Sequence, residues 1–181
     1  MTIFLPVAAL LVTLGCVFGA GDVPKCDKAI TSKMIKATDI IPTIQKNGQY
    51  SYVVVSSDEA KVLGIKVKCI GIKMANPSTV QVNYKLSSLL PSQFTFPVRE
   101  EEGVLIQKDS KEYKLYVMYM GDGVIFTYRC CDTCTSTKPN VGIAVANKLQ
   151  YTPATKSALK TAKEKMNELN LGSDVTTLPY C

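Results

Sequence analysis

From Tyr50 onward, apolar and polar residues alternate with a period of two, and turn-forming residues interrupt this pattern at short, regular intervals. Such alternation is typical of antiparallel β-sheet with one dry face and one wet face. The connecting segments are rich in Gly, Pro, Asn and Asp, and include a Gly-Asp-Gly hairpin at 121–123. The pattern predicts an all-β sandwich or barrel. We expect eight strands, at residues 50–55, 62–74, 79–86, 93–98, 103–107, 112–120, 123–131 and 141–146.

The same alternation predicts which side chains face the interior, because the apolar side of each strand is expected to be the dry one. In the seventh strand, for example, Phe126 and Tyr128 lie opposite Thr127 and Arg129. An eight-stranded closed sheet holds either packed side chains or one small ligand, so each inward residue has two readings, core or ligand contact. The inward candidates are Tyr52, Val54, Val67, Val82, Tyr84, Leu115, Val117, Phe126 and Tyr128.

One long helix is expected late in the chain. Thr152 suits the N-cap, Pro153 suits the first helical position, and Gly172 can end the helix in a left-handed conformation. Residues 174–177 then form a short extended tail that leads to Cys181. The apolar residues that recur at helical spacing are Leu159, Ala162, Met166 and Leu169.

The first 20 residues have the pattern of a secretory signal peptide. No charged residue occurs from Thr2 to Ala20, and an apolar run is followed by small residues that suit cleavage between Gly19 and Asp22. This stretch is at the short end of what a membrane span needs, and no basic stop-transfer cluster follows it. We therefore expect a signal peptide at 1–20, one domain at 21–181, and a secreted, extracellular protein.

Cysteine usage agrees with an oxidising compartment. Six cysteines follow the expected leader, and an even number favours three disulfides, although six cysteines allow 15 pairings. Spacing alone does not choose among those pairings. The six are Cys26, Cys69, Cys130, Cys131, Cys134 and Cys181.

Composition excludes several classes of function. The formal charge of +6 comes from scattered lysines, and Arg99 and Arg129 are the only arginines, which argues against a nucleic-acid-binding protein. The sequence has no histidine, which removes Ser-His-Asp and Cys-His nucleophiles, imidazole zinc sites and histidine-ligated haem. No paired-carboxylate motif or glycine-rich phosphate loop occurs either. We expect no enzyme activity, no metal and no cofactor.

The second half of the chain resembles the arthropod secreted lipocalins. The segment at 116–130, Tyr-Val-Met-Tyr-Met-Gly-Asp-Gly-Val-Ile-Phe-Thr-Tyr-Arg-Cys, is similar to their paired sixth and seventh strands. Residues 141–145, Thr152-Pro153, the helix and residues 174–181 follow in the order seen in triabin-type and procalin-type salivary lipocalins of blood-feeding bugs. The resemblance covers residues 26–181, with Tyr50 in place of the family's first-strand Trp. It implies an eight-stranded antiparallel up-and-down barrel with a C-terminal helix and a short terminal strand.

The resemblance also implies disulfide pairings. It pairs Cys26 with Cys130 and Cys69 with Cys181, which leaves Cys131 and Cys134 to bridge each other. We interpret the Cys-Asp-Thr-Cys loop as a local structural clip, because no thioredoxin-like βαβ pattern surrounds it. Adjacent Cys130 and Cys131 point to opposite faces of a strand, so either could join Cys26.

The function implied by the resemblance is a monomeric binding protein. It would bind and sequester a small, mostly apolar ligand, a lipid mediator or a biogenic amine, and so modulate host haemostasis or inflammation. The alternative is a ligand-free barrel whose loops inhibit a host protein such as a clotting protease or a platelet receptor. Neither involves nucleic acid or a membrane. An amine ligand needs a carboxylate in the cavity, and the acidic candidates are Asp58, Glu59, Glu100, Glu101 and Glu102.

Overall fold

The computed structural model describes residues 23–56, 67–86, 91–108, 111–136, 141–147, 152–171 and 175–181. The expected signal peptide lies outside these ranges, as does the predicted helix end at Gly172. Strands occur in all eight predicted places, with ends that differ by a few residues. They are β1 (Gln49–Ser56), β2 (Val67–Asn76), β3 (Thr79–Leu86), β4 (Ser92–Glu101), β5 (Val104–Lys108), β6 (Glu112–Gly121), β7 (Val124–Cys130) and β8 (Val141–Asn147).

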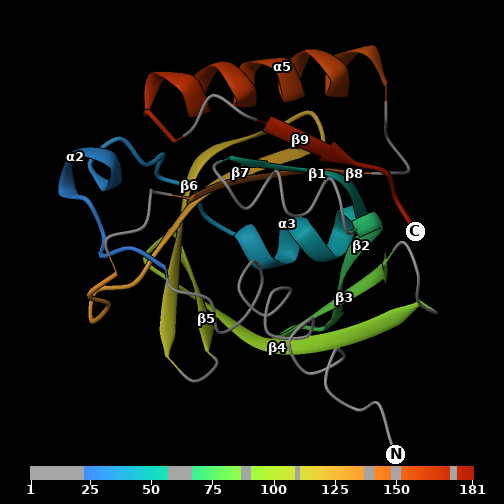
Figure 1. Cartoon of the computed structure of the whole chain (residues 1–181), viewed down its shortest axis with the longest axis horizontal. Helices are drawn as coiled ribbons and strands as arrows, with labels where there is room; N and C mark the ends of the chain where they lie inside the picture. Colours follow the sequence, from blue (N-terminus) through green and yellow to red (C-terminus); the bar gives the residue numbers. More distant parts are fainter. Residues whose placement is uncertain are drawn as a thin grey trace, which may run out of the picture.

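The strands form one antiparallel sheet that closes into a barrel (Figure 1). Neighbouring strands follow the order β2-β3-β4-β5-β6-β7-β8-β1, and pairing of β1 with β2 closes the ring. A ninth strand, β9 (Val175–Leu178), pairs with the edge of β1. The prediction of an eight-stranded antiparallel barrel with a C-terminal helix and a short terminal strand is confirmed.

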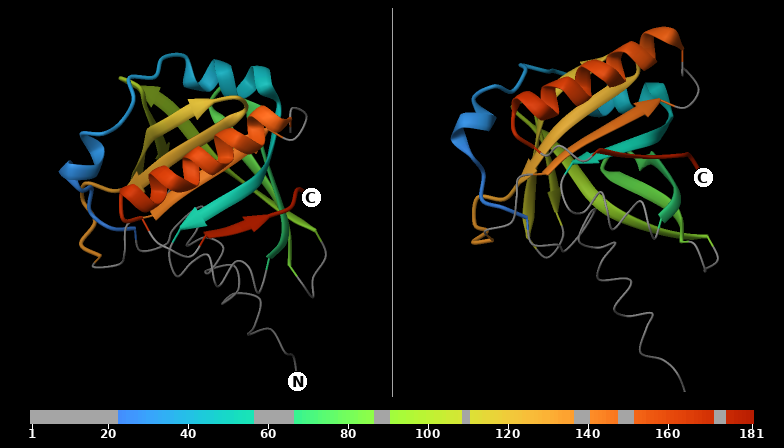
Figure 2. Two further views of the ribbon diagram at one scale, coloured as in Figure 1. Left: turned by 90° about the horizontal axis from the view of Figure 1, so that it is seen from above. Right: turned by 45° about the horizontal axis from the view of Figure 1, so that its top comes forward.

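The C-terminal segment completes the seam of the barrel. β1 pairs directly with β2 only at Gln49 and Tyr50. Beyond that point β9 lies along β1 (Figure 2). The backbone N–H of Ile70 in β2 donates to the carbonyl of Pro179, next to β9, at 2.8 Å. The tail therefore fills the gap where β1 and β2 diverge. The Cys69–Cys181 disulfide, with 4.9 Å between its Cα atoms, fixes the end of the tail to β2.

The long helix α5 (Pro153–Glu168) lies on the outer surface of the barrel, where it covers β7 and β8 (Figures 1 and 2). The predicted start is confirmed, because the Thr152 hydroxyl accepts a hydrogen bond from the Thr155 N–H at 3.3 Å and Pro153 occupies the first turn. The predicted stripe of Leu159, Ala162 and Met166 is buried against the barrel.

Two shorter helices, α2 (Lys28–Thr31) and α3 (Ile40–Asn47), were not predicted. α3 packs its isoleucines into the barrel core together with Tyr50, next to β2 and β4. Asp39 precedes it in a left-handed conformation and makes no side-chain capping hydrogen bond, so one of the usual start signals is missing. Packing against the barrel, rather than local propensity, stabilises this helix. Among the described helices, none is both long enough and apolar enough to cross a membrane.

Two further disulfides hold the N-terminal segment and the end of β7. Cys26 pairs with Cys130, which answers the question left open between Cys130 and Cys131. Cys131 pairs with Cys134 across a four-residue loop, and its backbone N–H donates to the carbonyl of Pro24 at 3.1 Å. These pairings, like that of Cys69 with Cys181, are the ones that the family resemblance implied.

Candidate functional site

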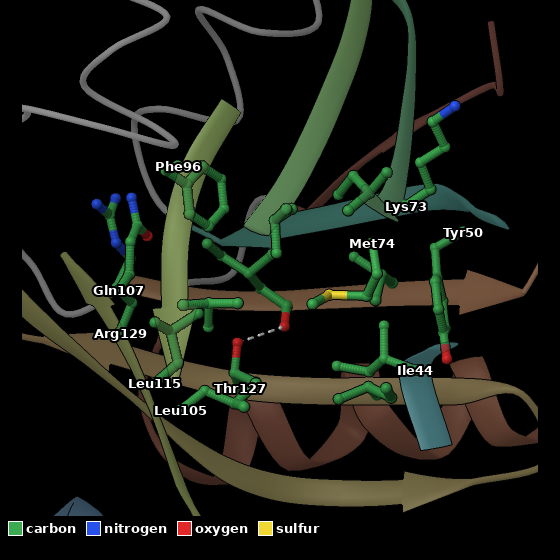
Figure 3. Close-up of a pocket in the computed structure, with 16 residues that line it drawn as sticks. Ile44, Tyr50, Lys73, Met74, Phe96, Leu105, Gln107, Leu115, Thr127 and Arg129 are labelled. Carbon is green, nitrogen blue, oxygen red and sulfur yellow. Dashed lines mark hydrogen bonds between the residues drawn. The ribbon is translucent and has the colours of Figure 1, made fainter. Parts of the chain in front are cut away.

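A cavity of about 110 Å³ lies inside the barrel (Figure 3). α3 and all eight barrel strands contribute to its wall, so it is a feature of the closed sheet rather than of one loop. Apolar side chains dominate the lining, and Ile44 of α3 and Tyr50 of β1 lie together at one end of it. Tyr50 is only 1% exposed and occupies the position where the family resemblance placed an aromatic residue.

The predicted inward residues divide into groups. Leu115 lines the cavity. Val82, Tyr84 and Val117 are buried, and they pack against cavity-lining residues without lining the cavity themselves. For β3 the predicted face is therefore the inner one, and Val80 on that same face lines the cavity.

Three further candidates belong to strands whose side chains are only partly described. Tyr52 and Val54 lie in β1 and Val67 begins β2, but their side chains fall outside the described part of the structure. In β2 the cavity wall includes Ile72 and Met74. The register of β2 against β3 shifts between Val67 and Cys69, an irregularity that alternation alone does not reveal.

The predicted facing of β7 is wrong. Phe126 and Tyr128 pack against α5 on the outside of the barrel, whereas Ile125, Thr127 and Arg129 line the cavity. The physical reason is that α5 covers the outer face of β7, so both faces of this strand are buried. When both faces are dry, the more apolar face need not be the inner one. The location of α5 is the tertiary information that the alternation lacked.

Polar groups gather at the cavity end opposite Tyr50 (Figure 3). Arg129 is 1% exposed and Gln107 is 2% exposed. The Arg129 guanidinium carbon lies 4.4 Å from the centre of the Tyr113 ring, and Tyr113 is the β6 residue directly opposite Gln107. The Thr127 hydroxyl donates to the carbonyl of Ile143 at 3.3 Å. The sequence had no signal that Arg129 and Gln107 would face inward, because charged and amide residues normally occupy the wet face.

Among the described residues that line this cavity, none is acidic. Glu100 instead accepts a hydrogen bond from the Ile41 backbone N–H at 3.0 Å, and Glu101 pairs with Arg99 at 2.6 Å on the surface. Glu102 is an exposed residue of the β4–β5 turn.

The remaining acidic candidates, Asp58 and Glu59, lie outside the described residues. Lys73 also belongs to the cavity wall, but its amino group points away from the cavity (Figure 3). Within the described ranges, no group of three or more His, Cys, Asp or Glu side chains is arranged to hold a metal ion.

No protein-family model and no curated protein matches the sequence. Solved structures with similar folds include apocrustacyanin C2, at 9% identity and a TM-score of 0.58, with 88% of this chain and 90% of that chain covered. The cockroach allergen Per a 4 gives 12% identity and a TM-score of 0.57, with coverage of 88% and 96%. The siderocalin Ex-FABP gives 15% identity and a TM-score of 0.50, with coverage of 74% and 93%. At such identities the likeness shows the fold, which is that of the lipocalins.

Proposed function

We propose that the protein is a secreted lipocalin that binds and sequesters one small, mostly apolar ligand in the barrel cavity. The observation that carries this proposal is the cavity itself. Its wall is almost entirely apolar, so a ligand that enters it removes apolar surface from water, which is favourable by roughly 25 cal/mol per Å². Lipocalin-sized barrels are wide enough to hold one such small ligand. The three disulfides support secretion, because such bridges persist in oxidising compartments.

The cavity favours one of the two ligand classes that the resemblance implied. A biogenic amine would bury an ammonium group, which needs a carboxylate partner, and none of the described residues of the wall is acidic. The apolar lining suits a lipid-like molecule instead. The volume is of the same order as that of a 150 Å³ engineered cavity that binds benzene, so we expect the ligand to be compact or to extend beyond the enclosed space. Among the structural relatives, siderocalin Ex-FABP functions through dual ligand specificities.

Sequestration also provides the link to a host. A binding protein that removes a lipid mediator from solution lowers the free concentration of that mediator, and so would reduce the haemostatic or inflammatory response that depends on it. The rival function, a ligand-free barrel acting on a host protein through its loops, predicts that the cavity plays no part in activity. Variants that change only the cavity therefore distinguish the two functions.

The test compares two variants that each add a phenyl ring. Ile125→Phe places the ring in the cavity, whereas Thr95→Phe places it on the exposed outer face of β4. The melting temperature of the secreted protein is measured across a panel of lipids and amines, since a ligand at about 100 times its dissociation constant adds about 2.7 kcal/mol of stability. We expect a lipid to stabilise the wild type and Thr95→Phe but not Ile125→Phe. Equal behaviour of all three proteins with every compound would overturn the proposal.

A further inference from the structure

We propose that the C-terminal tail, residues 175–181, is a removable wall of the barrel. Reduction of the Cys69–Cys181 disulfide by a dithiol releases this tail and opens the cavity sideways, between β1 and β2. The inference rests on the proposed function, because it assumes that a ligand occupies the cavity. It adds a route by which the ligand leaves and the chemical signal that opens the route.

The first support is the position of the tail in the barrel wall. Within the described strands, β1 pairs with β2 only at Gln49 and Tyr50. From residue 53 onward, β1 pairs with β8 on one side and with β9 on the other (Figure 2). The tail then reaches β2, where the Pro179 carbonyl accepts a hydrogen bond from the Ile70 N–H at 2.8 Å. The tail therefore joins β1 to β2 where the two strands have separated.

The second support is the contact of the tail with the apolar interior. Leu178 is 3% exposed and belongs to one buried cluster with Ile70, Val82, Tyr84 and Ile143. Ile143 also lines the cavity. Further cavity-lining residues pack against the same cluster, namely Ile72, Val80, Phe96 and Val145. Loss of the tail would therefore uncover side chains that border the cavity.

The contacts that hold the end of the tail are local and depend on the disulfide. The Tyr180 ring lies against Gly71 of β2, where a Cβ would be 2.8 Å from the ring atom Cε2, so a residue without a side chain makes room for the ring. The Tyr180 hydroxyl donates a hydrogen bond to the side-chain oxygen of Gln49. Chain ends that are not tied down are usually poorly ordered. The Cys69–Cys181 bridge is the covalent tie that keeps these contacts in place.

The third support is the exposure of this bridge. Cys181 is exposed and Cys69 is half-buried, whereas Cys131 and Cys134 are both buried. The remaining bridge joins a half-buried cysteine, Cys26, to a buried one, Cys130. Thiol–disulfide exchange needs access to a sulfur atom, so a dithiol should reduce the tail bridge first.

The reduction itself takes two steps. One thiolate of the dithiol attacks the Sγ atom of Cys181, forms a mixed disulfide and displaces the Cys69 thiolate. The second thiolate of the dithiol then displaces Cys181. The dithiol is oxidised to a disulfide, and its two protons end on the two cysteine thiols.

The experiment follows the bridge, the tail and the ligand separately in the wild-type protein. After mild treatment with dithiothreitol, alkylation and mass spectrometry should find free thiols at Cys69 and Cys181 before any appear at Cys131 and Cys134. Hydrogen exchange of the Ile70 amide should become at least about ten-fold faster. The Ile35 amide, which donates to the Val117 carbonyl at 2.9 Å elsewhere in the barrel, should change by less than about two-fold.

The ligand is followed with octanoate as a small, mostly apolar probe. Its dissociation rate constant, measured by NMR line-shape analysis, should rise at least about ten-fold on reduction. The double variant Cys69→Ala with Cys181→Ala should show the same changes in exchange and dissociation without a reductant. The matched control, Cys131→Ala with Cys134→Ala, should show neither. Should the first variant not fold, the three measurements on the reduced wild type decide.

The outcomes separate the inference from the function on which it rests. If Cys131 and Cys134 are reduced first, or if the Ile70 amide exchanges no faster after reduction, the switch is wrong although the cavity still binds octanoate. Faster exchange of Ile70 with unchanged dissociation would show that the tail does not close the cavity, and would also overturn the inference. If octanoate does not bind, the proposed function of the cavity fails and the inference fails with it.

Discussion

The disulfide between Cys69 and Cys181 should contribute much more to stability than the one between Cys131 and Cys134. The structure gives sequence separations of 112 and 3 for the two bridges. In the chain-entropy model, closing the longer loop lowers the entropy of the unfolded chain by the equivalent of about 4.8 kcal/mol at 25 °C, and closing the shorter loop by about 1.9 kcal/mol. The Cys26–Cys130 bridge already restricts the segment between residues 69 and 130, so the first value is an upper bound.

The contacts that the C-terminal tail makes in the folded protein also favour a large contribution from the Cys69–Cys181 bridge. Leu178 is 3% exposed, and the Ile70 N–H bonds to the Pro179 carbonyl. A tail that is no longer tied to β2 can leave these positions, so we expect loss of the bridge to lower the free energy of unfolding by about 4 kcal/mol.

The assay is urea unfolding of two double variants, Cys69→Ala with Cys181→Ala and Cys131→Ala with Cys134→Ala, followed by circular dichroism. Alanine is preferable to serine because Cys131 is buried and a hydroxyl there would add a separate cost. The reasoning is refuted if the Cys131–Cys134 variant loses as much stability as the Cys69–Cys181 variant, or more.

Three other substitutions test the packing. Phe126→Ala should cost about 3–5 kcal/mol in urea unfolding yet leave ligand affinity within about two-fold, since Phe126 is buried against α5 outside the barrel; a large loss of affinity in the folded variant would contradict this orientation. Burial raises the pKa of Tyr128 in the folded protein, and the hydrogen bond from the Asp27 N–H partly opposes this shift. Above a pH of about 10 the tyrosine therefore ionises in the unfolded chain while it stays neutral in the folded protein, so the free energy of unfolding should fall as pH rises. Tyr128→Phe should show a smaller fall between pH values of about 8 and 10.5, and an equal fall would show that Tyr128 is not responsible. Gly103→Ala should lower the free energy of unfolding by more than about 1 kcal/mol, because Gly103 has a φ of 77° and a Cβ there would lie 2.7 Å from the Ala37 carbonyl oxygen. An unchanged urea midpoint for this variant would refute that close contact.

Alternation along the chain was sufficient to predict the strands, but it left a sandwich and a barrel open, and the family resemblance favoured the barrel. Regular turns and a period of two located the strands, and Thr152 with Pro153 located the start of the helix. These features depend only on residues that are close together in the chain, so the sequence alone reveals them. The family resemblance added the disulfide pairs, which no local pattern could choose among.

The candidate site was predicted only in part because its position depends on contacts distant in sequence. Phe126 and Tyr128 look like interior residues until α5 is known to cover β7. In β6 the register shifts between Val117 and Tyr119, so Val117 faces the core inside the barrel while Tyr119 packs on the side of α5. A period of two cannot foresee such a bulge. The same limit concealed Arg129, whose charge suggested the solvent-facing side.

A single fluorescent reporter tests most directly whether the ligand lies inside the barrel. The sequence contains no tryptophan, so Phe96→Trp places the only indole at the cavity wall, and Tyr116→Trp places it on the outer side of the barrel beside Tyr128. Titration with octanoate should give a saturable change in the emission of Phe96→Trp and none in that of Tyr116→Trp. Saturable binding detected by calorimetry with no change in the emission of Phe96→Trp would contradict a ligand site in this cavity.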